Sequence, residues 1–83
     1  MKKSVTVRLQ AGLEARPIAL LVQKANQFTS SVYLEIDEKH INAKSIMGVM
    51  SLALMNGVEV VIHAEGPDEA EAIAELEAFL TAE

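Results

Sequence analysis

The sequence predicts an α+β fold: an open-faced two-layer sandwich of order βαββαβα, with a four-stranded antiparallel sheet and three helices on one face. Two patterns lead to this prediction. Short stretches in which apolar and polar residues alternate are typical of half-buried strands, and stretches with apolar residues at helical spacing lie between them. The chain has 83 residues, near the lower limit for one hydrophobic core, so we expect a single domain, 1–83.

The first half of the chain is expected to form a strand, a helix and a hairpin. Apolar residues alternate over residues 2–9, the first strand. A helix follows over residues 15–27, with Pro17 in its first turn, where the missing N–H of proline costs nothing. Alternation returns over residues 32–36. A two-residue loop, the length of a hairpin turn, then leads to a third strand over residues 39–43.

The second half is expected to add a helix, a strand and a final helix. Residues 46–55 are apolar at eight of ten positions, so a helix there, capped by Ser45, exposes part of its apolar surface. Alternation over residues 58–65 predicts the fourth strand. Pro67 is expected in the first turn of the last helix. The inner face of this helix is expected to contain Ala70, Ile73, Ala74, Leu76, Glu77 and Leu80.

Charge and composition exclude several classes of function. Seven basic and twelve acidic residues give a net charge of −5, which is the wrong sign for direct binding of nucleic acid. The chain has no cysteine, and its two histidines lie in separate segments, so we expect neither a metal site nor a cofactor. Without a long apolar run or a signal-peptide pattern, we expect a cytoplasmic protein that does not bind membranes.

The remaining charged residues are interpreted as surface positions. His40 and His63 alternate with apolar neighbours and are expected to face solvent on their strands. The acidic residues near the C-terminus are interpreted as a solvated face without basic partners, which aids solubility. They are Glu65, Asp68, Glu69, Glu71, Glu75 and Glu77.

Two motifs carry a resemblance that covers essentially the whole chain. They are Gly-Leu-Glu-Ala-Arg-Pro at residues 12–17 and Asn-Ala-Lys-Ser-Ile-Met-Gly-Val-Met-Ser-Leu at residues 42–52. Together, at this separation, they strongly resemble the two signature regions of HPr, the small phosphocarrier of the bacterial sugar phosphotransferase system. The resemblance implies an HPr-like fold.

One position departs from the phosphocarrier pattern. In HPr a histidine that opens the first helix accepts the phosphoryl group, and the position that resembles it here holds Glu14. A carboxylate could in principle form an acyl phosphate but not a phosphohistidine, so no phosphohistidine chemistry is expected. A contact between Glu14 and Arg16 would occupy the place of the phosphoryl group, which is a hypothesis. Whether Glu14 mimics a phosphorylated histidine, and whether it arose naturally or by engineering, stays open.

The second motif is intact. Four segments, at residues 7–9, 25–30, 42–44 and 51–53, resemble the catabolite-repression branch of the family, which has lost the histidine and kept the serine. This resemblance implies a regulatory protein without enzymatic activity, phosphorylated on Ser45 by HPr kinase/phosphorylase. The modified form then acts as corepressor of a LacI-type catabolite control repressor, which alone touches DNA. By the same resemblance, partner contacts are expected from Arg16, Leu20, Lys44, Ile46, Met47 and Met50.

Alternatives remain at this stage. The chain could be an HPr-type phosphocarrier altered at Glu14, and a small-ligand-binding domain is less well supported because no glycine-rich loop is present. Relatives in this branch can exchange the first strand between protomers. The short segment at residues 10–13 is a candidate hinge, so the sequence is compatible with a monomer and with a strand-exchanged homodimer.

Overall fold

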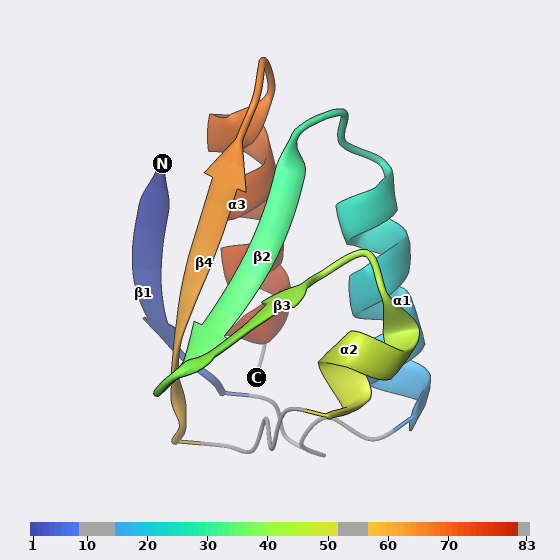
Figure 1. Ribbon diagram of the computed structural model, residues 1–83, viewed down its shortest axis with the longest axis vertical. Coiled ribbons are helices and arrows are strands. Elements are labelled where there is room, and N and C mark those ends of the chain that lie inside the picture. The colour runs from blue at the N-terminus through green and yellow to red at the C-terminus, as the bar shows by residue number, and fades with distance from the viewer. Residues whose placement is uncertain (9–14, 52–56, 82–83) are drawn as a thin grey trace.

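In the computed structural model, which describes residues 1–8, 15–51 and 57–81, the elements follow the predicted order (Figure 1). The described strands and helices are β1 (Lys2–Thr6), α1 (Ala15–Asn26), β2 (Ser31–Ile36), β3 (Lys39–Asn42), α2 (Ile46–Met50), β4 (Glu59–Glu65) and α3 (Glu69–Leu80). Among these helices, none is long and apolar enough to cross a membrane.

The four strands form one antiparallel sheet in the order β1-β4-β2-β3. The pairing of Val5 with Val60, and of Leu34 with Ile62, places apolar side chains of neighbouring strands on the same face. Because one residue of slippage would turn these side chains to the opposite face, the apolar pattern sets the register. In this strand order β1 and β3 form the two edges of the sheet, as Figure 1 shows.

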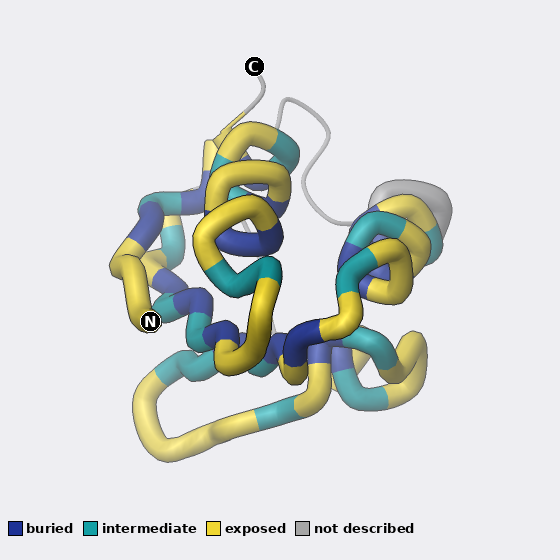
Figure 2. Tube along the Cα trace, turned by 90° about the horizontal axis from the view of Figure 1, so that it is seen from above, coloured by how far each residue is buried: buried dark blue, intermediate teal, exposed yellow. Residues whose placement is uncertain are grey.

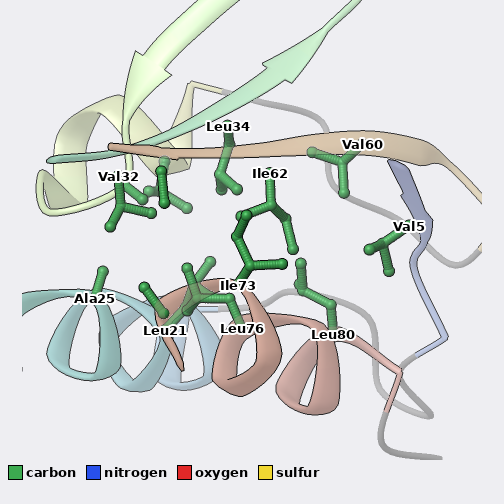
Figure 3. Packing of buried hydrophobic residues seen from close by; sticks show 14 of the residues in the cluster. Val5, Leu21, Ala25, Val32, Leu34, Val60, Ile62, Ile73, Leu76 and Leu80 are labelled. Carbon is green, nitrogen blue, oxygen red and sulfur yellow. The ribbon is translucent and has the colours of Figure 1, made fainter. Parts of the chain in front are cut away.

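The hydrophobic core lies between this sheet and the long helices α1 and α3 (Figure 3). Side chains of the strands point toward those of the helices, and the buried positions in Figure 2 gather between the two layers. α2 packs against α1 and β3. The buried apolar residues are Val5, Val7, Ile18, Leu21, Val22, Ala25, Val32, Leu34, Ala43, Val49, Val60, Ile62, Ala64, Ala72, Ile73, Leu76 and Leu80.

Three predicted element boundaries were wrong. α2 ends at Met50, with Ser51 as C-cap, whereas the prediction ran to residue 55; residues 52–55 lie outside the described residues. β1 ends at Thr6 instead of residue 9, although Val7 stays buried and its N–H donates to Val58 O at 2.9 Å. α3 begins at Glu69, with Asp68 as N-cap, so Pro67 precedes the cap and is not in the first turn. The carboxylate of Asp68 makes no cap hydrogen bond to its own helix, because it is bonded elsewhere.

The bonds of Asp68 join the loop before α3 to the loop after α1. Its carboxylate accepts from the backbone N–H groups of Thr29 and Ser30, both at 2.9 Å, and from the hydroxyl of Ser30. These hydrogen bonds, the one from the Ser30 side chain first, lower the pKa of Asp68 below its ordinary value. Gly66 passes so close that a Cβ there would lie 2.5 Å from Ser30 Oγ, so this junction requires glycine.

The inner face of α3 also differs from the prediction. Its buried residues are Ala72, Ile73, Leu76 and Leu80, whereas Ala70 and Ala74 are exposed and Glu77 lies at the margin. Alanine is compatible with either face of a helix, so only the larger residues indicated the buried face.

Some of the acidic residues near the C-terminus, Glu69, Glu75 and Glu77 among them, have basic partners, contrary to the sequence-based expectation. Glu77 pairs with Lys3 at 2.8 Å and Glu75 with Lys24 at 3.6 Å. The amino group of Met1 lies 2.9 Å from a carboxylate oxygen of Glu69, and this hydrogen bond lowers the pKa of that carboxyl group. These partners come from Met1, β1 and α1, far away in the sequence. Each exposed pair contributes little to stability.

The expectation for the two histidines was correct for His40 and wrong for His63. Both belong to the face of the sheet opposite the core, but the side chain of His63 is only 17% exposed. Tyr33 on β2 lies beside it, with ring centroids 6.1 Å apart, and Glu65 lies 3.0 Å from its Nε2. The alternation of apolar and polar residues in β4 predicts that His63 faces solvent, but side chains of the neighbouring strand cover it.

Candidate functional site: Ser45 and the apolar surface beside it

Ser45 is the N-cap of α2, as predicted. Its side-chain oxygen accepts a hydrogen bond from the backbone N–H of Gly48 at 3.2 Å, and its carbonyl accepts from Val49 N at 3.0 Å. Serine is favoured here because its hydroxyl satisfies an N–H that has no partner within the helix. Ser45 is exposed at the surface. A backbone N–H takes up no proton, so this contact does not activate the hydroxyl as a nucleophile.

The turn before Ser45 is attached to the end of α1. Asn42 closes the turn, since its side-chain oxygen accepts from Lys44 N at 2.8 Å and its carbonyl accepts from Ser45 N at 3.1 Å. The Nζ of Lys44 donates to Phe28 O at 2.7 Å, and Asn26 Nδ2 donates to Lys44 O at 3.3 Å. These contacts fix the position of Ser45 relative to α1.

The attachment was missed at the sequence level, where Lys44 was considered only as a partner contact. Its ammonium group instead binds the carbonyl of Phe28 in the loop that follows α1, and positive charge near the C-terminal end of a helix is favoured. A local signal was present, because asparagine two residues before a backbone donor often forms a side-chain turn.

Four apolar side chains on the neighbouring helices α1 and α2 are exposed, in agreement with the sequence-based prediction of exposure. The exposed fractions are 44% for Leu20 on α1, and 46%, 83% and 56% for Ile46, Met47 and Met50 on α2. We call this group the α1–α2 apolar patch. Val49 is the one buried residue of the described helix α2. Exposed apolar groups of this kind are typical of protein-binding surfaces, and flexible methionines adapt to several partners.

The second predicted site falls largely outside the described residues. Glu14 and the side chain of Arg16 are not described, so the predicted contact between them stays a prediction. α1 begins at Ala15, as the motif predicted. In the described ranges, no group of three or more histidine or acidic side chains could hold a metal ion.

Comparison with known proteins agrees with the fold. The family model described as PTS HPr component phosphorylation site matches residues 1–82. The chain therefore belongs to the HPr family of the phosphotransferase system.

Within this family, the chain is similar to proteins of two kinds. It is 55% identical to the HPr-like protein Crh of Bacillus subtilis (strain 168), over the whole chain and 98% of that protein. A structure of the phosphocarrier protein HPr from Bacillus anthracis superimposes with a TM-score of 0.92 at 49% identity, covering 96% of this chain and 95% of that one.

A third relative is a crystal structure of Crh, the catabolite-repression protein of Bacillus subtilis, as an intertwined dimer with a swapped domain. It has a TM-score of 0.81 and 58% identity, and the match covers 95% of this chain and 91% of that chain. The fold is thus shared with a phosphocarrier and with a catabolite-repression protein.

Proposed function

We propose that this chain is a non-enzymatic regulatory protein of carbon catabolite repression in the cytoplasm. HPr kinase/phosphorylase phosphorylates Ser45, and the modified chain then binds a LacI-type catabolite control repressor as its corepressor. The observation that carries the proposal is the exposed hydroxyl of Ser45 at the start of α2, next to the α1–α2 apolar patch. Similarity to Crh supports the assignment to catabolite repression.

Phosphorylation would change the charge of this surface without requiring a change of fold. A phosphoserine carries about −1.5 to −2 charges at pH 7, and the first turn of α2 contains no acidic residue to repel it. A partner that recognises both the phosphate and the α1–α2 apolar patch needs a basic pocket for the phosphate and an apolar surface around it for the patch. Charge-assisted hydrogen bonds to arginine or lysine suit the phosphate, while buried methionine side chains add affinity.

The residue at position 14 favours this role over that of a phosphocarrier. A carrier of the HPr type needs a histidine nitrogen as nucleophile, and Glu14 offers none. A carboxylate could form only an acyl phosphate, whose chemistry differs from that of a phosphohistidine. The serine region is complete, so modification by a kinase remains available to the chain.

The decisive experiment is incubation with HPr kinase/phosphorylase and ATP, followed by intact mass measurement and peptide mapping. One phosphate is expected, located on Ser45 and absent from Ser45→Ala. Ser51→Ala is the matched control, because Ser51 is an exposed serine at the other end of α2. A phosphate mapped to Ser51, or no phosphate at all, would contradict the proposal.

A second incubation, with phosphoenolpyruvate and the first enzyme of the phosphotransferase system, separates the two classes of function. A regulatory protein without the histidine is expected to stay unlabelled. Label on the unaltered chain, at any residue, would instead support a phosphocarrier.

We also propose that two copies can form a homodimer by exchanging β1. Support comes from the swapped dimer of Crh and from the position of β1 at the sheet edge, where it pairs only with β4 among the described strands. The candidate hinge at residues 10–13 lies outside the described residues. Sedimentation over a range of concentrations should reveal a dimer, and a single monomeric species throughout would contradict this proposal.

A further inference from the structure

Gly48 occupies a helical position where glycine has no conformational role. It is the third residue of α2, and its φ lies outside the left-handed region, in contrast to Gly57 and Gly66. Glycine weakens a helix compared with alanine because it has more conformational freedom to lose. The helix α2 therefore carries a destabilising residue without any backbone reason for it.

The space beside Gly48 supplies a reason. A Cβ built on this residue would lie 3.4 Å from both Cβ and Oγ of Ser45, and 3.5 Å from Asn42 O. These are ordinary contact distances, so an alanine would fit against the bare hydroxyl. The same methyl group would leave no gap between itself and Ser45 Oγ for any further atom.

A phosphoryl group on Ser45 needs that gap. Its oxygens extend beyond Oγ, and the nearest known donor is the N–H of Gly48, which already lies 3.2 Å from Oγ. A phosphoryl oxygen that replaces Oγ as the acceptor of this N–H would lie close to the position of a Cβ on residue 48, which is 3.4 Å from Oγ. Asn42 O limits the space from the side of the turn.

We infer that Gly48 is a specificity-determining residue for the modification of Ser45, because its missing side chain leaves room for the phosphoryl group. The inference rests on the proposed phosphorylation of Ser45 and extends it to a second residue. It separates two requirements of the site: Ser45 supplies the hydroxyl, and Gly48 supplies the space into which the product fits. The unmodified chain needs only the first of these.

The test compares chains with and without phosphoserine placed at position 45 during synthesis, which requires no kinase. In the unmodified state, Gly48→Ala is expected to melt at the same temperature as the parent chain or a higher one. In the phosphorylated state, the parent chain should keep its melting temperature, whereas Gly48→Ala should lose several degrees. The unmodified form of each chain is the matched control for the effect of alanine on the helix.

Each possible result of the melting comparison either supports or overturns the inference about Gly48. An equal shift of both chains on phosphorylation would overturn it, and so would an unmodified Gly48→Ala chain that fails to fold, since the space would then serve the bare hydroxyl. A kinase assay gives a second measurement, in which Gly48→Ala is expected to be phosphorylated at least tenfold more slowly. If the kinase does not modify even the parent chain, the proposed function fails, while the melting comparison still decides the role of Gly48.

Discussion

Replacement of Met47 by aspartate is expected to weaken binding of the phosphorylated chain to its repressor by about tenfold or more. Met47 is 83% exposed, so almost the whole side chain is available for burial by a partner. Full burial of a methionine side chain contributes about 1.5–3 kcal/mol, and tenfold in affinity corresponds to about 1.4 kcal/mol. Met47→Asp removes most of that gain and places a charge that must be desolvated in the complex.

The assay is a binding titration with phosphorylated chains, together with circular dichroism and thermal melting. Because Met47 lies outside the core, Met47→Asp should keep the spectrum and the cooperative melting of the parent chain. Ala70→Asp is the matched control, since it adds the same charge at an exposed position of α3 and should bind like the parent chain. Unchanged affinity of Met47→Asp would refute the assignment of the patch, and loss of folding would refute the surface position.

Four further predictions concern single positions. Ser45→Ala should lower the free energy of unfolding by about 0.5–2 kcal/mol through loss of the cap, as measured by urea denaturation. Lys44→Met should lower it by about 1 kcal/mol, because the hydrogen bond to Phe28 O is lost; no change would mean that the bond has no net value. The folded-state pKa of Asp68 lies below its ordinary value of 3.8, so its stabilising contribution is complete above that pH and is lost as the pH falls through the folded-state pKa. Asp68→Asn should therefore reduce the fall in urea midpoint between pH 6 and pH 3, and an identical fall would contradict this. Glu14→His should gain partial phosphoenolpyruvate-dependent labelling, and a folded variant without any label would show that more than one residue separates this chain from a carrier.

The strands were predictable because alternation is a local pattern with a direct physical cause. Val60, Ile62 and Ala64 occupy every second position of β4, and all three are buried against the helices. The same holds for the exposure of α2, where apolar residues surround a short helix that has only one buried residue. A segment that is apolar on all sides and covers only part of the core must expose some of its side chains.

Features that depend on distant parts of the chain were not predictable in this way. From the sequence, Asp68 was interpreted as part of a solvated acidic face, but its carboxylate binds the loop at Thr29 and Ser30, which lies 38 or 39 residues away. The partners of Glu69, Glu75 and Glu77 on α3 likewise come from the first residues of the chain and from α1. Such pairs are decided by which loops and edges the fold brings together, and neither composition nor periodicity contains that information. For Lys44, the resemblance implied only a partner contact, whereas the loop after α1 determines where its ammonium group binds.

The uncovered face of the sheet gives the molecule a natural optical probe. The chain contains one tyrosine and no tryptophan, so its intrinsic fluorescence comes from Tyr33 alone. The ring of Tyr33 lies 4.6 Å from that of His40 and 6.1 Å from that of His63, between ring centroids. The emission therefore reports on packing between β2, β3 and β4. Unfolding of the sheet can be followed without any attached dye, in the same sample in which modification of Ser45 is measured by mass.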